Sequence, residues 1–587
     1  MVPAITKKTS LRGRFFFVDV SLINAAVFLF LSWLSPFHFV PWVSWHSEAL
    51  LFFATFFFPL TIIFPLVVKD NSRLISVPVL ILPFIALTVL AVGQVATGRI
   101  TFGGDALVIL LYIALCIVCL TSGHSSVLNT KGANETGVIK NSFVLNLIAA
   151  SVLLGGIVSA IVEFAQVFEI WEQSSWINRM PQLRRPGGNL GQPNQLATLF
   201  SMGIASLLFL YESGKLKAAS GLLIYIVLCT ALAMTESRTG VLSLILLTGW
   251  YLSRSRQARF KIPHWGVVGA CVTALTFFWI WPSIFNFILQ TTGVDNAVVN
   301  VNPGYRLIVW PQLLEAVAQR PWLGWGLNQV PKAHNAVASS YLLSEPYSYS
   351  HNILIDLALG LGLPLALLLV LVTGVWLWRR VRRATQLLPW YCVAVVLPVA
   401  VHSMFEFPFT YAYFLVPVML VLGVLEGLSG GKSALKIGIR PAAAFLLAIS
   451  AVAAWSVVEY VEIEEDFRVA RFEALRVGQT PLNYERPRIV LLTQLDALLE
   501  GARIIPRPGM SLGELDLAKN VALRYPWVAT QNRYALSLAL NGSLDEALRQ
   551  LRVMRALHGE KEFTKIRENW RALGREKYPE LRVLGLP

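Results

Sequence analysis

Two guanidinium groups and three carboxamides gather in one short, glycine-rich segment of this sequence. The segment runs from Arg184 and Arg185 through Asn189 and Gln192 to Asn194. Arginine binds phosphate through two parallel hydrogen bonds, and glycines let backbone N–H groups approach an anion. The pattern therefore indicates an anion site. A surface turn that contacts lipid headgroups is the structural alternative.

Two single arginines and a histidine mark three further segments. Arg238 lies at a helix start near the membrane plane, where snorkelling to the interface is the alternative. Arg306 precedes an amphipathic helix predicted over 307–318, where an ordinary surface arginine is the alternative. His351 stands before a long apolar run, where it could act as a base near neutral pH or cap the helix together with Asn352. Taken together, these groups predict a site for a lipid phosphate or diphosphate beside a candidate base.

The elements that must position these groups are membrane helices. Of the 587 residues, 55% are hydrophobic and 14% are charged, whereas a soluble domain carries about 25% charged residues. The apolar residues form runs on the order of 20 residues, the length that a bilayer requires. We predict an all-α polytopic membrane protein with about 12 or 13 spans. The predicted spans are 15–34, 49–68, 74–93, 106–120, 143–162, 196–210, 221–234, 241–252, 265–285, 353–378, 390–401, 411–425 and 441–458.

The distribution of basic residues predicts the orientation of these spans. The net charge of +15 is spread over short loops and a tail, which favours topology signals over a nucleic-acid surface. Alternate loops are basic, among them those at Lys215, Arg254 and Arg379, and basic loops stay in the cytoplasm. The long loop 286–350 and the tail are then expected on the opposite side. All five cysteines lie in apolar runs, so no disulfide framework is expected.

A change in composition after Val458 predicts a second domain. We expect a transmembrane domain over 1–458, which includes the loop 286–350, and a soluble helical domain over 459–587 on the periplasmic side. Residues 532–558 read as a helical hairpin that resembles one tetratricopeptide unit.

Several of these segments, in this order, resemble the PglL-type protein O-oligosaccharyltransferases, in the superfamily of O-antigen ligases and Wzy polymerases. The resemblance begins with Arg185 to Asn194 followed by Gln195-Leu196-Ala197-Thr198. It continues with Ser237 to Gly240, Arg306 to Trp310, Pro321 to Gly326, and Ser350-His351-Asn352. Residues 35–41, residues 402–408 with Glu406, and Tyr411 favour the PglL branch.

The resemblance implies a GT-C-like fold in the bacterial inner membrane with an active site that faces the periplasm. It implies a glycosyltransferase that moves a glycan from undecaprenyl diphosphate to Ser or Thr of a pilin-like periplasmic protein. The alternatives are lipid A-core as acceptor, as in O-antigen ligases, and a Wzy-type polymerase. The family is regarded as needing no cofactor and no metal.

The same resemblance assigns roles to individual residues. His351, Arg185, Arg238 and Arg306 are expected to be catalytic. A second group is expected to bind substrate, namely Arg184, Asn189, Gln192, Asn194, Glu406 and Tyr411. Membrane lipids are expected partners and nucleic acids are not. A transporter would need polar residues deep within its spans, and the sequence has few. A non-catalytic scaffold would leave the outward arginines unexplained.

Overall fold

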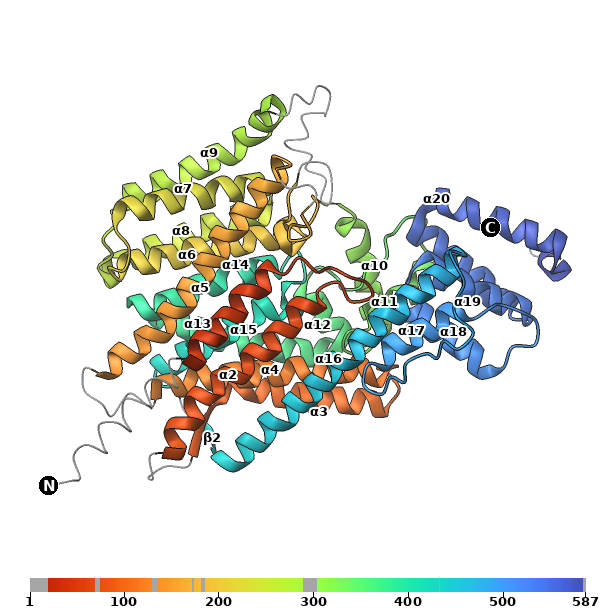
Figure 1. Cartoon of the computed structure of the whole chain (residues 1–587), viewed down its shortest axis with the longest axis horizontal. Helices are drawn as coiled ribbons and strands as arrows, with labels where there is room; N and C mark the ends of the chain where they lie inside the picture. Colours follow the sequence, from red (N-terminus) through yellow and green to blue (C-terminus); the bar gives the residue numbers. More distant parts are fainter. Residues whose placement is uncertain are drawn as a thin grey trace. The chain divides into compact units, whose positions relative to one another are not determined.

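A computed structural model describes residues 20–68, 74–128, 136–170, 174–180, 185–288, 304–431 and 433–583 (Figure 1). Arg184, the basic N-terminal segment before residue 20 and part of the long loop 286–350 lie outside the described residues. The elements that follow the first helix, Val20–Leu34, are α2 (Trp45–Val68), β1 (Leu74–Pro78), η1 (Val79–Ile81), α3 (Leu82–Ala96), α4 (Gly103–Leu128), α5 (Thr136–Val167), η2 (Gly188–Leu190), α6 (Pro193–Glu212), α7 (Ala218–Met234), α8 (Arg238–Ala258), α9 (His264–Ile288), α10 (Arg306–Gln319), α11 (Val330–Ala338), α12 (Ile353–Leu361), α13 (Leu363–Arg383), α14 (Leu387–His402), η4 (Pro408–Thr410), α15 (Ala412–Leu428), β2 (Ser433–Gly438), α16 (Ile439–Leu475), α17 (Thr493–Arg503), α18 (Leu512–Arg524), α19 (Val528–Leu540), α20 (Leu544–Glu576) and η5 (Pro579–Val583).

The predicted class is confirmed: the chain is an all-α polytopic membrane protein. Among the described residues, seven helices are long and apolar enough to cross a membrane. Four shorter apolar helices add to them: Val20–Leu34, α7, α14 and α15. Within the described residues, helices cover most of each predicted span, except at residues 74–78 and at a break at Gly362. Whether the chain crosses the membrane 12 or 13 times stays a prediction, because length and composition alone do not fix crossings.

The prediction of a helix over 74–93 is wrong in its first residues. Residues 74–78 form β1, which pairs antiparallel with β2. Leu74 lies opposite Gly438, and Val77 lies opposite Leu435. Val77 packs with Leu80, Ile81 and Leu120 in a small apolar cluster. β-Branched residues favour the extended chain, and this packing overrides the apolar run that suggested helix.

The prediction of one continuous helix over 353–378 is also wrong. The helix breaks at Gly362, which adopts φ +78° between α12 and α13. The chain at Pro321 approaches closely there, since the Leu363 N–H donates to the Pro321 carbonyl oxygen at 2.7 Å. A Cβ on Gly362 would lie 2.5 Å from the Trp322 backbone. Glycine is therefore required at this break for both conformation and space.

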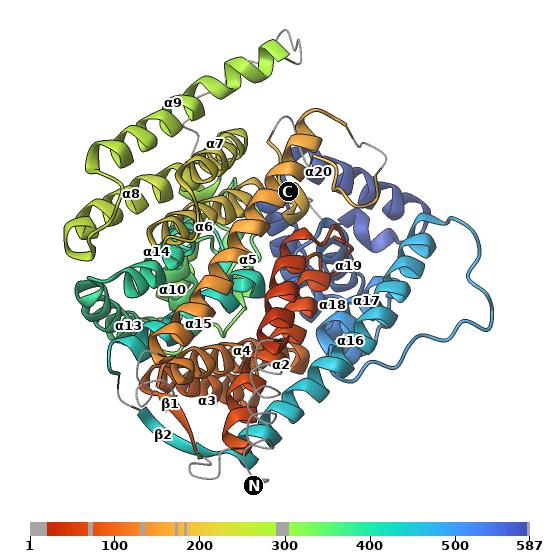
Figure 2. The same ribbon diagram turned by 60° about the vertical axis from the view of Figure 1, so that its left-hand side comes forward.

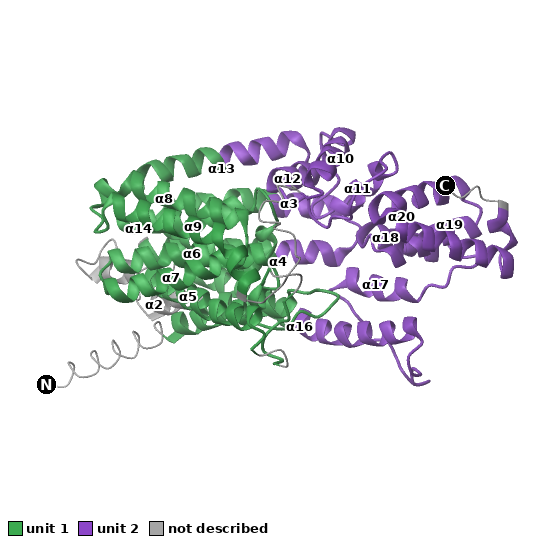
Figure 3. Cartoon of the chain, turned by 90° about the horizontal axis from the view of Figure 1, so that it is seen from above, with its two compact units in different colours: residues 1–86, 112–300, 373–454 green, residues 87–111, 301–372, 455–587 purple. Residues whose placement is uncertain are grey.

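The chain divides into two compact units (Figure 3). Unit 1 comprises residues 1–86, 112–300 and 373–454, and unit 2 comprises 87–111, 301–372 and 455–587. The predicted boundary at residue 458 stays a prediction.

Unit 1 is a bundle of apolar helices around α6. α5, α7, α8 and α14 pack against α6, α9 packs on α7 and α8, and α15 packs between α14 and α2 (Figures 1 and 2). The described residues of α6 are largely buried, including Leu196, Phe200 and Phe209. An element this buried in a helix bundle holds its N-terminal end in a fixed position.

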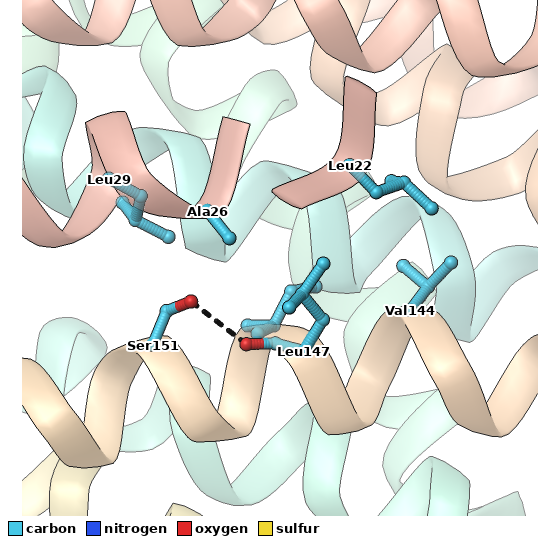
Figure 4. Close-up of a pocket in the computed structure, with 7 residues that line it drawn as sticks. Leu22, Ala26, Leu29, Val144, Leu147 and Ser151 are labelled. Atoms are coloured by element: carbon cyan, nitrogen blue, oxygen red, sulfur yellow. Dashed lines mark hydrogen bonds between the residues drawn. The ribbon is translucent and has the colours of Figure 1, made fainter. Parts of the chain in front are cut away.

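A small apolar pocket lies in unit 1 between the first helix and α5 (Figure 4). Leu22, Ala26 and Leu29 line it from one side, and Val144, Leu147 and Ser151 line it from the other. The Ser151 hydroxyl donates to the Leu147 carbonyl oxygen of its own helix at 2.9 Å, so the lining presents hydrocarbon.

Unit 2 joins the helices of residues 306–361 to the helices of the tail. α11 packs against α10, α12, α18 and α20. Asn335 of α11 exchanges hydrogen bonds with Gln550 of α20 at 3.2 Å. The predicted hairpin is confirmed as α19 and α20, with Gly542 at φ +85° in the turn between them. α20 bends at Gly559, which has φ +80° inside the helix.

Candidate functional site

The Arg185 guanidinium is held by two elements of unit 1. Its Nε donates to the Thr235 carbonyl oxygen at 3.1 Å, at the C-terminal end of α7. Its Nη2 donates to the Asn194 side-chain oxygen at 3.4 Å, in the first turn of α6. Two anchors of this kind fix the plane of the guanidinium, and a fixed plane is what bidentate recognition of phosphate needs.

Asn194 links three motifs that the sequence keeps far apart. Its side-chain oxygen accepts a hydrogen bond from Ser237 Oγ at 2.8 Å, as well as the one from Arg185. Its side-chain nitrogen donates to Glu406 Oε1 at 3.4 Å. The structure therefore brings the first, second and last of the predicted motifs of unit 1 into one hydrogen-bonded group, which we call the Asn194 cluster: Arg185, Asn194, Ser237 and Glu406.

The N-termini of two helices meet at this cluster. Ser237 is the N-cap of α8, and its hydroxyl accepts from the Gly240 N–H at 3.3 Å. Arg238 is exposed and is the first residue of α8. α6 begins one residue before Asn194. Helix N-termini carry partial positive charge, so the backbone and the two arginines together favour an anion here.

The remaining predicted residues of unit 1 fall into different surroundings. The side-chain oxygen of Gln192 is buried and has no hydrogen-bond partner among the described residues, as a group that awaits a ligand would. Tyr411 stacks on Phe407 and on Tyr413, with ring centroids 5.9 and 5.1 Å away. Asn189 is buried, and its amide bonds to the backbone of Leu34, Trp176 and Asn178. That pattern suits a residue that holds the loop better than one that contacts substrate.

Sequence reasoning gave no role to several residues that support the cluster. His402 lies 2.8 Å from the Thr198 hydroxyl, one turn after Asn194 in α6. Glu48 of α2 accepts from the Ala412 N–H at 2.7 Å and so caps α15 beside Tyr411. Glu48 is a carboxylate directly before the apolar run 49–68, and that position was a signal that could have singled it out.

In unit 2, His351 occupies a strained turn directly before α12. Its φ is +60°, a conformation that residues other than glycine, asparagine and aspartate rarely adopt. Its ring lies against Tyr347, with centroids 4.5 Å apart. The helix cap is Asn352, whose side-chain oxygen accepts from the N–H groups of Leu354 and Ile355. Asn352, the neighbour of His351, therefore supplies the N-cap of α12, and the role of His351 stays a prediction.

A hydrogen bond ties the helix of Arg306 to the turn of His351. Arg306 is the first residue of α10, and Trp310 follows it by one turn on the same face. Trp310 Nε1 donates to the Ser350 carbonyl oxygen at 2.7 Å. Ser350 is held in turn by Asp356, whose carboxylate accepts from its N–H at 3.0 Å. Unit 2 thus presents a cation and an imidazole from two joined elements.

Within the described ranges there is no group of three or more His, Cys, Asp or Glu that could hold a metal ion. The expectation of a metal-independent reaction stays a prediction.

Three protein families match successive parts of the chain. The protein glycosylation ligase family matches residues 186–211, and the O-antigen ligase family matches residues 222–370. The C-terminal region of the virulence factor membrane-bound polymerase family matches residues 390–572. The first match contains Asn194, the second contains Arg238, Arg306 and His351, and the third contains Glu406.

Two relatives come from Acinetobacter baylyi. A general O-oligosaccharyltransferase is 25% identical over 573 residues, which cover 92% of this chain and 93% of the relative. A ComP-specific O-oligosaccharyltransferase is 26% identical over 338 residues, which cover 57% of this chain and 59% of that relative.

The helical membrane fold, the cationic motifs and these matches define an enzyme that transfers glycosyl groups. Within that class, the chain is similar over most of its length to an O-oligosaccharyltransferase and in part to the protein glycosylation ligase and O-antigen ligase families, which supports the predicted resemblance to PglL-type enzymes.

Proposed function

We propose that the protein transfers a glycan from undecaprenyl diphosphate to Ser or Thr hydroxyls of exported proteins, on the periplasmic side of the inner membrane. The observation that carries the proposal is the Asn194 cluster, in which Arg185 is fixed beside the N-termini of α6 and α8. The match to the protein glycosylation ligase family and the relative named as ComP-specific support a protein rather than a lipid as the acceptor.

The donor half of the reaction needs positive charge at the diphosphate. As the bond between the sugar C1 and the diphosphate oxygen breaks, negative charge grows on that oxygen. Arg185, Arg238 and Arg306 stabilise it, since cations held in advance cost no reorganisation during the reaction. Gln192 and Tyr411 contact glycan or diphosphate oxygens. The diphosphate leaves with the bonding electrons, and no metal is required in this scheme.

The acceptor half needs a base at the incoming hydroxyl. His351 takes the hydroxyl proton as the acceptor oxygen bonds to C1, and the positive charge of the imidazolium balances the negative charge that the departing diphosphate gains. Arg306 and His351 enter this proposal from their motifs and from their own surroundings in unit 2. Stacking on Tyr347 and the rigid turn at Ser350 limit the motion of the imidazole.

O-antigen ligation is the second candidate, and the family match over 222–370 favours it. In that case the acceptor is a lipid A-core sugar and the donor chemistry is unchanged.

Coexpression separates the two functions. A host that makes a lipid-linked glycan, and that lacks its own ligase, would carry this protein together with a candidate pilin. We expect a glycan mass on Ser- or Thr-containing peptides of the pilin and unmodified lipid A-core. Glycan on lipid A-core and none on protein would instead establish the ligase function. A vector that encodes Arg185→Ala controls for background transfer.

A further inference from the structure

A second hydrogen-bonded network lies behind the glycine-rich segment 185–194. Asn178 sits at its centre: its N–H donates to the Asn189 side-chain oxygen at 3.1 Å, and its amide nitrogen donates to the Asn189 carbonyl oxygen at 3.3 Å. Gln166 of α5 donates to the Asn178 carbonyl oxygen at 2.6 Å and accepts from the Gly188 N–H at 2.9 Å. The network fixes the turn that leads into α6.

His38 closes this network from the segment between the first helix and α2. Its Nδ1 lies 2.8 Å from the Asn178 amide nitrogen. The imidazole also hydrogen-bonds the Leu190 carbonyl oxygen. Gly191 lies beside the ring, where a Cβ would be in ordinary van der Waals contact with Nε2 at 3.4 Å. His38 thus contacts the C-terminal end of the turn formed by residues 188–191.

These contacts select one protonation state of His38. The Asn178 amide nitrogen is a donor, because it also donates to the Asn189 carbonyl oxygen. Nδ1 of His38 must then accept, so the proton of the neutral ring lies on Nε2, which leaves Nε2 as the donor to the Leu190 carbonyl oxygen. A proton on Nδ1 would oppose the Asn178 amide and would turn toward the Pro36 carbonyl oxygen, 3.4 Å from Nδ1.

We propose that His38 is a positioning residue for glycan transfer: its neutral imidazole holds Asn178, and through Asn178 and Asn189 it holds the turn that presents Arg185 and Asn194. The inference rests on the proposed function, because it assigns His38 a role in presenting the diphosphate-binding arginine. The polar contacts of His38 Nδ1 are with Pro36 and Asn178, so His38 acts on Arg185 and Asn194 through the turn and is not one of the transferring groups.

The protonation state gives this role a pH dependence. Burial lowers the pKa of His38 below its usual 6.5 and outweighs the hydrogen bonds to the Pro36 and Leu190 backbone, which raise it. His46 is the titratable group that faces His38 from α2. The other packed segments present uncharged groups to the His38 ring: the backbone of Pro36 and Leu190, the amide of Asn178, and Gly191. Since the neutral ring is required, transfer should fall as the pH drops through the pKa of His38.

Two substitutions of His38 separate positioning from general stability. His38→Phe keeps the ring but leaves the Asn178 amide without its acceptor, and we expect transfer per enzyme to fall about five- to a hundredfold. His38→Asn places an amide oxygen where Nδ1 stood and does not titrate, so we expect transfer within about threefold of wild type near neutral pH.

The matched control is His264→Asn. His264 belongs to the same unit and lies 2.6 Å from the Ser255 hydroxyl. Ser255 is near the C-terminal end of α8, and Arg238 begins that helix. A helix of this length separates the two ends by about 25–30 Å, so the control should show wild-type transfer and the wild-type pH profile.

The measurement is transfer from a lipid diphosphate-linked glycan to an acceptor peptide in membranes, between about pH 5 and pH 8, divided by the amount of inserted enzyme. At each pH, the transfer rate of His38→Asn is divided by that of the wild-type protein, so the titration of the donor diphosphate and of all other shared groups cancels. We expect this ratio to rise as the pH falls.

A flat ratio, together with the wild-type profile in His38→Phe, would overturn the inference. Loss of inserted protein in His38→Phe, with unchanged transfer per enzyme and an unchanged profile, would show a structural role only and would also overturn it. Arg185→Ala in the same assay tests the proposed function separately. Full transfer by Arg185→Ala would contradict the proposed diphosphate site, whereas its loss alongside a flat ratio would reject only the role of His38.

Discussion

Replacement of Asn194 by aspartate changes the charge of the Asn194 cluster with little change in shape. The hydrogen bond from the Asn194 amide to Glu406 Oε1, 3.4 Å long, becomes a contact between two carboxylate oxygens. The new charge also lies within 3.4 Å of the Arg185 guanidinium, at the position of the present side-chain oxygen. Asn194→Asp therefore places a negative charge that is repelled by Glu406 and that neutralises Arg185, the cation that we assign to the diphosphate.

The size of both effects follows from the distances. Two unit charges about 4 Å apart interact by about 4 kcal/mol at an effective dielectric constant of 20. With its charge neutralised by the new carboxylate, Arg185 would stabilise the transition state by at most about 4 kcal/mol less, which corresponds to about a thousandfold in rate. We expect kcat/KM of Asn194→Asp to fall about a hundred- to a thousandfold, and the thermal midpoint in detergent to fall as well.

A charge swap separates these two consequences. Asn194→Asp combined with Glu406→Gln restores an amide opposite a carboxylate and the wild-type net charge, so the repulsion disappears. We expect the thermal midpoint to recover while transfer stays slow, because the carboxylate remains beside Arg185. The assay is thermal unfolding of purified protein together with transfer to an acceptor peptide. Wild-type transfer by the doubly substituted enzyme would refute the proposal that the free positive charge of Arg185 stabilises the departing diphosphate.

Two further predictions concern unit 2 and the topology. Arg524 of α18 makes a bidentate ion pair with Asp105 of α4 at 2.9 Å, and the Asp105 side chain is 2% exposed. Arg524→Met leaves the buried carboxylate without its partner and should destabilise unit 2 by about 3–5 kcal/mol, measured as faster proteolysis of the tail. Arg468→Met breaks the exposed pair with Glu465 and should leave proteolysis unchanged. Alkaline phosphatase fused after Pro587 should be active, because α16 is long and apolar enough to cross the membrane before the tail begins; an inactive fusion would place the tail in the cytoplasm.

The sequence predicted the helices well, because a bilayer sets their length and apolar composition. It failed where local chemistry competes with that rule. Residues 74–78 are apolar enough to continue a span, yet they pair with β2, a partner more than 350 residues away. The break at Gly362 had a local signal, a glycine two residues before Pro364, which is typical of one helix ending and the next beginning.

The motifs of the candidate site could be predicted from the sequence, but the hydrogen bonds that join them could not. Glycine-rich, cationic and histidine-containing segments can be recognised by residue type. The bonds from Asn194 to Ser237 and Glu406 join residues 43 and 212 positions apart, and only the packing of α6, α8 and α14 determines them. The same applies to Asn189, whose residue type suggested binding and whose buried contacts indicate support of the loop.

The most direct test of the central claim, that these motifs carry the transfer chemistry, is the single-turnover rate of purified His351→Asn with a lipid diphosphate-linked glycan and an acceptor peptide. Asparagine accepts the left-handed backbone of this position, φ +60°, so the substitution removes the imidazole without adding strain. We predict normal folding and a rate about a hundred- to ten-thousandfold below wild type. A rate within about threefold of wild type would contradict the account.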